Sequence, residues 1–283
     1  MSKEIYFGLA QWHHSKWYTR SSPSNASLAQ YCNSFSSVEG NSSFYALPSE
    51  KSLDLWYQTS PDYFKFCFKF PQEISHKQVL THCSRQGCDF FYRISLLKDK
   101  LGLLWLQLDA RFSVLELQKL ERFISALPTQ FNYAVEVRHL DFFNKDQSER
   151  RFNQLLKSHN INRVIFDTRS LFANSQLTDL ATSEALQAKP KVPTHVIATD
   201  SSPLVRIIVP MDSKLGEQVL QQWARKAAQW LDQGLTPYFF LHTPDNARAP
   251  ELARYFSQLI NRHRTQVDVI KLWGQQQNQQ LLF

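Results

Sequence analysis

Hydrophobic and aromatic residues recur along the chain in short runs that are typical of buried β-strands. Within several runs they alternate with other residues at every second position, which is the period of a strand. FKFCFKF, at residues 64–70, is the clearest example. We predict eight strands: Ile5–Leu9, Ser37–Asn41, Phe64–Phe70, Leu103–Leu108, Tyr133–Arg138, Arg163–Asp167, Leu204–Val209 and Pro237–His242.

Longer amphipathic stretches fill most intervals between these runs and predict helices. They include Ser27–Phe35, Ser49–Gln58, Val114–Leu127, Ser148–His159, Leu215–Gln233 and Ala249–His263. Eight strands that alternate with helices predict an α/β fold, a single TIM-type (β/α)8 barrel. A doubly wound open sheet is the alternative, but its first strand–helix turn carries a glycine fingerprint that this chain lacks.

Two stretches fall outside this alternation. Residues 171–199 are rich in Ala, Ser, Thr, Pro and Lys, and we expect them to form an ordered excursion between the sixth and seventh strands. Residues 273–283 are rich in glutamine and lack the periodicity needed to pack, so we expect a flexible tail. The expected division is therefore 1–272 for the barrel and 273–283 for the tail.

The alternation also predicts which side chains face the barrel interior. In the third strand the phenylalanines face the surrounding helices, so Lys69 points into the barrel mouth. Side chains expected to point inward by the same parity are Glu39, Asn41, Gln107, Glu136, Arg138, Asp167 and His242.

Ionisable side chains inside a barrel are costly unless they are paired or bind a ligand. Here they gather at the carboxyl ends of strands, where TIM-type barrels build their active sites. We therefore expect a functional site at that end. The alternative is a structural layer of ion pairs, Glu39 with Lys69 and Glu136 with Arg138, that plugs the core without chemistry.

Composition narrows the class of protein further. The chain has 283 residues, of which 43% are hydrophobic and 13% aromatic, and this excludes a disordered chain. It has seven glycines and no G-x-G-x-x-G or G-x-x-x-x-G-K-[ST] string, so we expect no glycine-rich phosphate cradle. The net charge of +7 permits a polyanionic or phosphorylated partner without requiring one.

The four cysteines do not indicate a disulfide framework in a chain of this length. The spacing of His82, Cys83 and Cys88 is loose for a metal site and favours ordinary thiols. The first residues, MSKEIYFG, lack the apolar core of a signal peptide, and no run of 18 apolar residues exists. We therefore expect a cytoplasmic protein with reduced thiols and no membrane span.

Strings along the whole chain resemble a single bacterial family. They are GLAQW (8–12), FSSVEGNSSFYALPS (35–49), W-x3-S-P (56–61), FKFCFKFP-x2-ISH (64–76), LG-x4-QL (101–108), FNYAVEVRH (131–139) and FLHTPDNARAPELA (240–253). These strings resemble the YecE-like family, the domain of unknown function 72, whose members form TIM-type barrels.

The resemblance implies a pocket but no reaction, because the family has no established one. The pocket residues it implies are Trp12, Glu39, Asn41, Tyr45, Lys69, His76, Gln107, Glu136, Arg138, Asp167, Arg206 and His242. At the ends of the seventh and eighth strands the chain departs from the family. It has VRIIVP and LHTP where many members have an R-x-H-G-like string and paired asparagines.

Several chemistries fit such a pocket. Glu39, Lys69, Glu136 and Asp167 are the candidate catalytic residues. Two carboxylates would act as base and electrostatic partner on opposite sides of one substrate. Arg138 and Arg206 would hold a phosphate or carboxylate. Lys69 would serve either as a Schiff-base amine or as a counter-ion.

A divalent metal and an aromatic stacking surface are further alternatives. Metal ligands would come from Glu39, Glu136, Asp167, His76 and His242, although no local spacing supports such a site. Trp12 and Tyr45 would stack on a sugar or a base, or else pack as an aromatic rim on the first helix.

The last five residues are Gln279-Gln280-Leu281-Leu282-Phe283, which resemble the Q-x-x-L-F peptide that binds the bacterial DNA sliding clamp. A polar leader would present Gln279 and the two apolar anchors Leu282 and Phe283 to a preformed groove. The alternative is that the two anchors pack back onto the barrel.

Three functions follow from these features. The first is a hydrolase or lyase of DNA metabolism that acts on a phosphodiester, an abasic site or a damaged nucleotide, recruited by the clamp. The second is an isomerase or hydrolase of a sugar or sugar phosphate. The third is a barrel that binds a ligand or nucleic acid without turnover.

Overall fold

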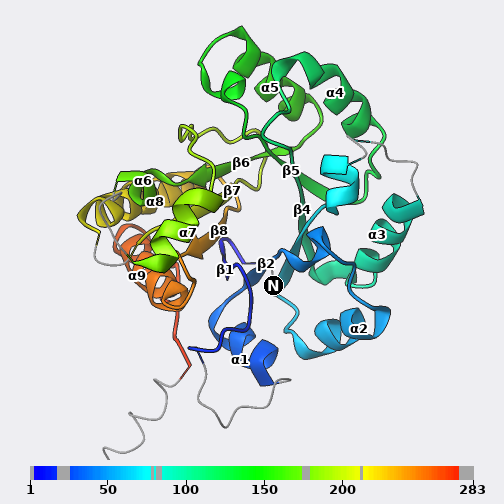
Figure 1. Cartoon of the computed structure of the whole chain (residues 1–283). Coiled ribbons are helices and arrows are strands. Elements are labelled where there is room, and N and C mark those ends of the chain that lie inside the picture. Colours follow the sequence, from blue (N-terminus) through cyan, green and yellow to red (C-terminus); the bar gives the residue numbers. More distant parts are fainter. Residues whose placement is uncertain are drawn as a thin grey trace, which may run out of the picture.

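Eight parallel strands form one sheet in the computed structural model (Figure 1). They are β1 (Tyr6–Leu9), β2 (Ser37–Gly40), β3 (Lys65–Lys69), β4 (Leu101–Gln107), β5 (Asn132–Glu136), β6 (Asn162–Asp167), β7 (Leu204–Ile208) and β8 (Tyr238–His242). Each strand from β2 to β7 pairs with the strand that follows it in the chain, and β8 also pairs with β1. The structure describes residues 3–17, 26–77, 80, 85–173, 179–210 and 213–273. The predicted TIM-type barrel is confirmed.

The remaining gap in the strand order, between β1 and β2, is closed largely by side chains. Ser36 accepts a hydrogen bond from Phe7 N at 3.0 Å through its Oγ, and its own N–H donates to Phe7 O at 3.1 Å. The buried Tyr31 hydroxyl accepts from Leu9 N and donates to Ser37 O, both at 2.8 Å. One tyrosine therefore bridges two strand backbones at this seam.

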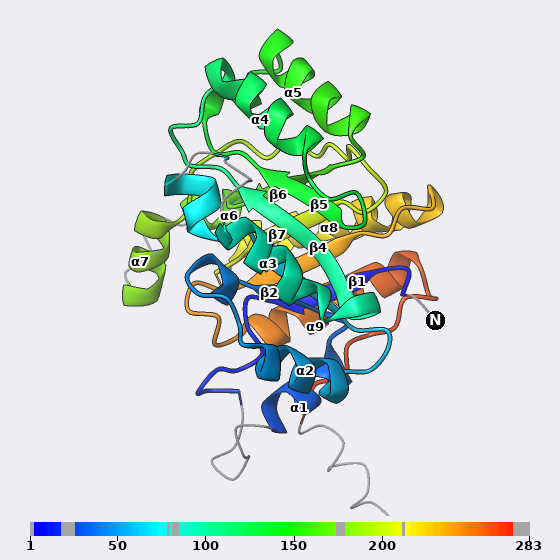
Figure 2. The same cartoon turned by 90° about the vertical axis from the view of Figure 1, so that its right-hand side faces the viewer.

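Helices surround the strands (Figures 1 and 2). They are α1 (Ala26–Ser34), α2 (Glu50–Thr59), α3 (Arg85–Ser95), α4 (Leu117–Ser125), α5 (Gln147–Ser158), α6 (Arg169–Ala173), α7 (Leu180–Ala188), α8 (Lys214–Asp232) and α9 (Ala249–His263). Short helical turns are η1 (Ser42–Phe44), η2 (Glu73–Lys77), η3 (Lys98–Lys100), η4 (Val114–Glu116) and η5 (Leu140–Phe143). Within the described residues, no helix has the length and apolarity to cross a membrane.

The six expected helices are present. Ala249–His263 has the expected bounds and the other five have ends shifted by one to three residues, whereas α3, α6 and α7 were not among those expected. In the described residues 171–173 and 179–199, the chain forms the expected excursion between the sixth and seventh strands. It contains α7, a short helix with Asp179 as its N-cap, followed by an extended segment that leads to β7. We call residues 189–200, which form neither helix nor strand between α7 and β7, the strap.

Buried side chains form two layers, as the parity of the strands predicts. The barrel interior is filled by Tyr6, Cys67, Leu103, Trp105, Ala134, Val164, Leu204, Tyr238 and Phe240. The phenylalanines at 64, 66, 68 and 70 lie in the other layer, between strands and helices. Beyond this apolar interior, charged inward side chains gather at the carboxyl ends of the strands, which we call the mouth.

Candidate functional site at the barrel mouth

Arg206, on β7, is the centre of an ion-pair network at the mouth. Its Nε and NH2 atoms donate to the two oxygens of Glu39, on β2, at 3.0 and 2.8 Å. Its NH1 atom donates to Glu136, on β5, at 2.9 Å. All three side chains are at least 95% buried. Such a two-pronged pairing fixes the guanidinium in one orientation, so Arg206 ties together three separate strands.

The carboxylate of Glu136 also pairs with a second arginine, through the oxygen that does not accept from Arg206. Arg138 Nε donates to Glu136 Oε1 at 2.9 Å, and Arg138 NH2 donates to Gln107 Oε1 at 2.6 Å. Gln107 and Glu136 are register partners on β4 and β5, which explains why one guanidinium reaches both. Arg138 remains 20% exposed and is the solvent-facing edge of the network.

Glu39 has two further donors. Asn41 Nδ2 donates to its Oε1 at 2.9 Å, and His242 Nε2, on β8, lies 3.0 Å from its Oε2. Burial lowers the pKa of His242 despite the nearby carboxylate, so the imidazole is neutral and donates from Nε2. Glu39 therefore accepts four hydrogen bonds from three side chains.

Both carboxylates are ionised. Burial alone would raise their pKa values, but the positive charges around them outweigh this effect. The charge of Arg206, together with the hydrogen bonds from Arg206 and from the neutral His242, holds the pKa of Glu39 well below its usual range. Arg138, Arg206 and Lys69 lower the pKa of Glu136 to about 2. Neither group carries a proton at neutral pH, which excludes both as general acids in this state.

Lys69, at the end of β3, has a different environment. Its side chain is buried, with 8% of the residue exposed. Its ammonium lies 4.8 Å from the ring centre of Phe44 and 5.8 Å from that of Trp105. It forms no hydrogen bond or ion pair with the described residues. Burial, together with the charge of Arg206, lowers the pKa of Lys69 to about 8.

An aromatic rim surrounds Lys69 on the solvent side. Phe44, in η1, contacts Tyr45 and His76 edge-on, with ring centres 5.1 Å apart in both pairs. Tyr45 is 76% exposed, and His76 follows β3 in η2. Burial lowers the pKa of His76, so its imidazole is neutral at pH 7. The sequence prediction placed Tyr45 and His76 here but did not single out Phe44.

Lys189, the first residue of the strap, is a second lysine that the sequence prediction missed. The Pro190 carbonyl accepts a hydrogen bond from Thr168 Oγ1 at 3.1 Å, which holds this part of the strap at the end of β6. Burial, and next the charge of Arg206, lower the pKa of Lys189. No spacing in a stretch of such low regularity would have placed this lysine at the mouth.

Asp167 does not join the network, so its predicted inward orientation is wrong. The inward side chain at this level of β6 is Phe166, whose ring centre lies 4.3 Å from the guanidinium carbon of Arg206. Asp167 points toward the helices and accepts hydrogen bonds from Trp223 Nε1 at 2.8 Å and from Thr194 Oγ1 at 3.2 Å. Arg169 also pairs with it at 2.7 Å. Asp167 is therefore a fully paired carboxylate outside the mouth.

Trp12 is likewise not a wall of the mouth. Its ring packs edge-on against Trp56, on α2, and against Phe66, with centres 4.9 and 6.4 Å apart. Phe66 belongs to the layer between strands and helices. Trp12 therefore packs as the aromatic rim that sequence reasoning kept as an alternative, although on α2 and not on the first helix.

The metal alternative does not fit the arrangement of the described residues. Among them no three His, Cys, Asp or Glu side chains come together in a group suited to a metal ion. Glu39 and Glu136 face arginines, and Asp167 lies outside the mouth. Cys32 and Cys67 are buried, and burial raises the pKa of each to about 12. His82 and Cys83 lie outside the described residues.

The ion-pair alternative is half right. Glu136 does pair with Arg138, but Glu39 pairs with Arg206 and His242 and not with Lys69. This difference decides what the mouth offers a ligand, because Arg206 occupies the carboxylate that would have neutralised Lys69. Glu39, Asn41, Gln107, Glu136, Arg138, Arg206 and His242 are brought together as expected.

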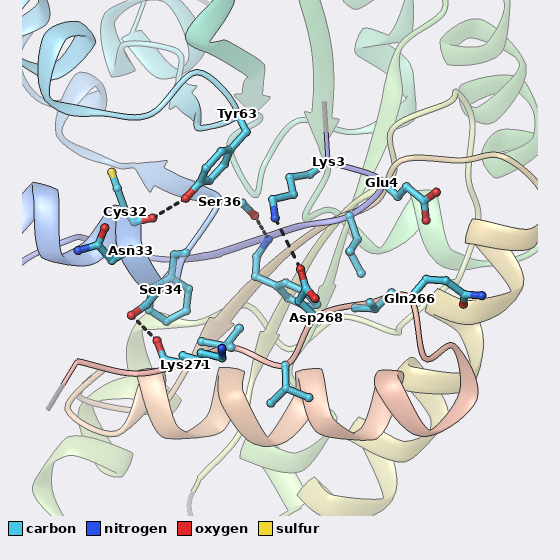
Figure 3. Close-up of a pocket in the computed structure, with 16 residues that line it drawn as sticks. Lys3, Glu4, Cys32, Asn33, Ser34, Ser36, Tyr63, Gln266, Asp268 and Lys271 are labelled. Carbon is cyan, nitrogen blue, oxygen red and sulfur yellow. Dashed lines mark hydrogen bonds and ion pairs between the residues drawn. The ribbon is translucent and has the colours of Figure 1, made fainter. Parts of the chain in front are cut away.

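A cavity of about 620 Å³ lies away from this network, beside the amino-terminal ends of the strands. Residues just before β1, β2 and β3 line it together with residues 266–271 (Figure 3). Lys3 points toward Asp268 across the cavity, at 3.9 Å, and the Tyr63 hydroxyl donates to Cys32 O at 3.1 Å. Its polar groups are exposed or already paired, so it lacks the concentrated charge of the mouth.

Comparison with known proteins assigns the family. The model of a family described as protein of unknown function DUF72 matches residues 6–280. The chain belongs to the DUF72 family. It is 44% identical over 248 residues to the UPF0759 protein YecE of Escherichia coli, both in strain K12 and in O157:H7, and the match covers 88% of this chain and 89% of YecE.

Solved structures of other DUF72 proteins share the fold. One from Enterococcus faecalis V583 superposes with a TM-score of 0.66 at 18% identity, over 91% of this chain and 95% of that chain. One from Thermotoga maritima MSB8 superposes with a TM-score of 0.64 at 19% identity, over 91% and 99%. At such low identity these DUF72 structures support the barrel and carry no assignment of a reaction.

Proposed function

We propose that this DUF72 chain is a lyase or hydrolase that acts on a phosphorylated sugar derivative with a free carbonyl group, through the amine of Lys69. The observation that carries the proposal is the state of that amine. It is buried at the carboxyl ends of the strands, has no protein counter-ion of its own among the described residues, and has a pKa of about 8.

A lysine with this pKa is a useful nucleophile near neutral pH. About a tenth of Lys69 is neutral at pH 7, roughly 300-fold more than for a lysine of ordinary pKa. Paired lysines in salt bridges are held in the charged form instead. The carboxylates of the mouth are occupied by Arg206 and Arg138, so they keep the site polar without neutralising the amine by pairing.

The proposed step is addition of the Lys69 amine to an aldehyde or ketone carbon. The nitrogen lone pair forms the new bond, and loss of one water molecule gives an imine. The imine makes a proton on the adjacent carbon acidic. Removal of that proton allows an oxygen substituent at the next carbon to leave with its bonding electrons. In this proposal His76, which is neutral and contacts the same Phe44 ring as Lys69, accepts the proton.

Two substrates share this chemistry: the ring-opened sugar of an abasic site in DNA, and a free aldose phosphate. Both present a carbonyl carbon and a phosphate group. The positive net charge of +7 is compatible with the nucleic-acid source. The proposed chemistry requires only the carbonyl and phosphate groups that the two substrates share, so the experiment includes both substrates.

The test is chemical trapping. The full chain is incubated with an abasic oligonucleotide or with ribose 5-phosphate, reduced with sodium cyanoborohydride, and analysed by intact mass and peptide mapping. We expect one adduct on Lys69, and its yield to rise with pH through about 8 as the amine loses its proton. Absence of any adduct with both substrates would support a barrel that binds its ligand without turnover.

The matched control lies on the same strand. Lys65 begins β3, and its amine donates to the Asp99 carbonyl at the opposite end of the barrel. Lys69→Met should abolish trapping, and Lys65→Met should leave it unchanged. An adduct that persists in Lys69→Met would overturn the proposal, provided that near-UV circular dichroism shows the variant to be folded.

We also propose that the tail recruits the chain to the DNA sliding clamp. The support is the sequence Gln279 to Phe283, which matches the spacing of a clamp-binding peptide. These residues lie outside the described part of the structure. If the clamp is the partner, the abasic oligonucleotide is the relevant substrate of the two.

A further inference from the structure

Two arginines belong to the network at the mouth, and they differ in what they leave for a ligand. All three nitrogens of Arg206 donate to Glu39 or Glu136, and its side chain is 5% exposed. Arg138 donates from Nε to Glu136 and from NH2 to Gln107, while its NH1 atom makes no hydrogen bond with the described residues. Its side chain is 20% exposed. Arg138, and not Arg206, therefore has a cationic donor to offer a ligand that enters from solvent.

Gln107 adds a second donor beside this one. A guanidinium only donates, so the Gln107 oxygen must face Arg138, and the amide nitrogen Nε2 is left at the other corner of the amide. This Nε2 makes no hydrogen bond with the described residues. Arg138 NH1 shares a carbon atom with NH2, and Gln107 Nε2 shares one with Oε1. The two uncommitted donors therefore flank the 2.6 Å hydrogen bond that joins the side chains.

The donor pair is held in place before any ligand arrives. Gln107 and Glu136 are register partners on β4 and β5, and Glu136 accepts from Arg138 Nε at 2.9 Å. Glu136 is fixed in turn by Arg206. Side chains that are already ordered lose little conformational entropy on binding. Several neighbouring donors, one of them cationic, suit an oxyanion such as a phosphate.

The strand register places this donor pair on the solvent side of Lys69. Lys69, on β3, is the register partner of Trp105, on β4, and Gln107 follows Trp105 by two residues on the same face of the strand. Two residues of a strand span about 6.6 Å and neighbouring strands lie about 4.8 Å apart, which separates the Cα atoms of Lys69 and Gln107 by about 8 Å. Gln107 is nearer the carboxyl end, so a ligand that contacts both sites has its anionic group outward and its carbonyl inward.

We propose that Arg138 and Gln107 bind the phosphate of the substrate while Lys69 forms the imine with its carbonyl carbon. This inference rests on the proposed function and names the residues that make it specific for a phosphorylated substrate. The two roles fall to different side chains, because a guanidinium keeps its charge when the lysine gives up its proton. Since the phosphate lies on the solvent side, an outer oxygen has room for a further substituent, and the site accepts a phosphodiester as well as a monoester.

The test measures binding in the absence of amine chemistry. Titration calorimetry compares ribose 5-phosphate with ribose on the Lys69→Met chain, which cannot form the imine. We expect ribose 5-phosphate to bind at least about tenfold more tightly, in line with one hydrogen bond between charged groups. The methyl ester of ribose 5-phosphate should keep most of this advantage, because its added group extends toward solvent.

Two variants in the same background identify the binding residues. Arg138→Gln should lose the advantage of the phosphorylated sugar. Gln107→Glu should lose it as well, because the new carboxylate pairs with the Arg138 guanidinium and repels the phosphate. This second variant retains the pair of Arg138 with Glu136, so it tests the inference even where Arg138→Gln fails to fold.

Arg111 provides the matched control. It follows β4 four residues after Gln107, is 88% exposed, and pairs with Asp109 through two hydrogen bonds of 2.9 and 3.3 Å. Arg111→Gln should keep the advantage of the phosphorylated sugar. Equal binding of ribose and ribose 5-phosphate, or an advantage that survives in a folded Arg138→Gln variant, would overturn the inference. Loss of binding by the methyl ester would overturn the outward position of the phosphate.

The two proposals fail separately. A phosphate advantage that depends on Arg138, without any trapped adduct on Lys69, keeps the anion site and removes the reaction. An adduct on Lys69 of the unmodified chain that forms equally well with ribose and with ribose 5-phosphate keeps the amine chemistry and removes the phosphate site.

Discussion

Arg206 holds together two carboxylates that come from strands on different sides of the barrel. The pairing explains why both remain ionised although they are buried. It also carries a risk for the fold, because removal of Arg206 would leave Glu39 without a charged partner and Glu136 with Arg138 alone. Arg206 is therefore a structural requirement for the mouth, and Lys69 is the group it leaves free to react.

Replacement of Arg206 by glutamine should lower the free energy of unfolding at pH 7 by about 3–5 kcal/mol, because Glu39 and Glu136 lose their shared cation. Urea unfolding monitored by circular dichroism measures this change. In the variant the folded-state pKa of Glu39, which loses its only charged partner, should rise above its unfolded value. The free energy of unfolding of the variant should therefore rise, relative to that of the unmodified chain, as the pH falls from 7 to 5.

The unmodified chain should show the opposite dependence on pH. The folded-state pKa of Glu136 is about 2, below its usual value of 4.5. A depressed carboxyl pKa contributes stability that is fully present above the unfolded value and is lost as the pH falls toward the folded value. A stability difference between Arg206→Gln and the unmodified chain that is constant from pH 7 to pH 5 would contradict this account of the network.

Sequence parity could predict most of the mouth residue by residue. FKFCFKF and YAVEVR alternate strictly, so Lys69 and Glu136 could be oriented correctly from the pattern. The partners could not be predicted, because Glu39 reaches Arg206 across the barrel and not Lys69. Asp167 was misplaced since RVIFD contains apolar residues of both parities, and only the contact of Phe166 with Arg206 decides the orientation.

At the scale of elements, the strands could be predicted because their buried runs are short and are separated by amphipathic helices. The strap and α7 could not, because neither has the regular apolar face of the other helices. α7 is placed by contact of Ala185 with the ends of β6 and β7, which is tertiary packing and leaves no local pattern. The position of α7 and of the strap, which carries Lys189, was therefore the least predictable from the sequence pattern.

The seam between β1 and β2 is held in part by one side-chain hydroxyl, that of Tyr31. Tyr31→Phe removes the hydroxyl that joins Leu9 N to Ser37 O and leaves both groups buried without it. We expect a loss of about 1–3 kcal/mol in the free energy of unfolding. Amide hydrogen exchange should speed up at Leu9 well before it does in the centre of the sheet.

Tyr63→Phe is the control for this prediction. Its hydroxyl donates to the Cys32 carbonyl near the seam but does not touch either strand of it. The variant should unfold close to the unmodified chain and should keep slow exchange at Leu9. Equal acceleration of Leu9 exchange in both variants would show that Tyr31 does not close the seam.

The whole molecule separates its charge from its apolar interior along the barrel axis. Phe240 and Trp105 fill the interior, and the charged network lies at the carboxyl ends of the strands. The scarcity of glycine fits this division, because the phosphate of the proposed substrate would be held by side chains of the mouth and not by a glycine-rich loop. The tail, proposed to bind the clamp, would then serve recruitment while the mouth serves chemistry.

If the tail recruits the chain to the sliding clamp, the two purified proteins should bind each other through the tail. Purified sliding clamp should retain the full chain in a pull-down, and the double variant Leu282→Ala and Phe283→Ala should lose retention, because the two apolar anchors supply most of the binding energy of such a peptide. Gln276→Ala and Gln277→Ala, in the polar leader, form the matched control and should bind normally. Retention that is unchanged by loss of the anchors would remove the clamp proposal and leave the barrel proposals as they stand.

The pairing of β1 with β8 has a consequence during synthesis of the chain. Tyr6 is the register partner of Tyr238, so the first strand cannot take its place in the sheet until the eighth has been made. At about 5–20 residues per second, this delay is on the order of tens of seconds. During that time the strands from β2 onward can pair in succession, while Tyr6–Leu9 has only the Tyr31 and Ser36 side of the seam to contact. A ribosome-bound chain that ends before β8 is therefore an open sheet with an unsatisfied edge, and chaperones that recognise apolar strands have this interval in which to act.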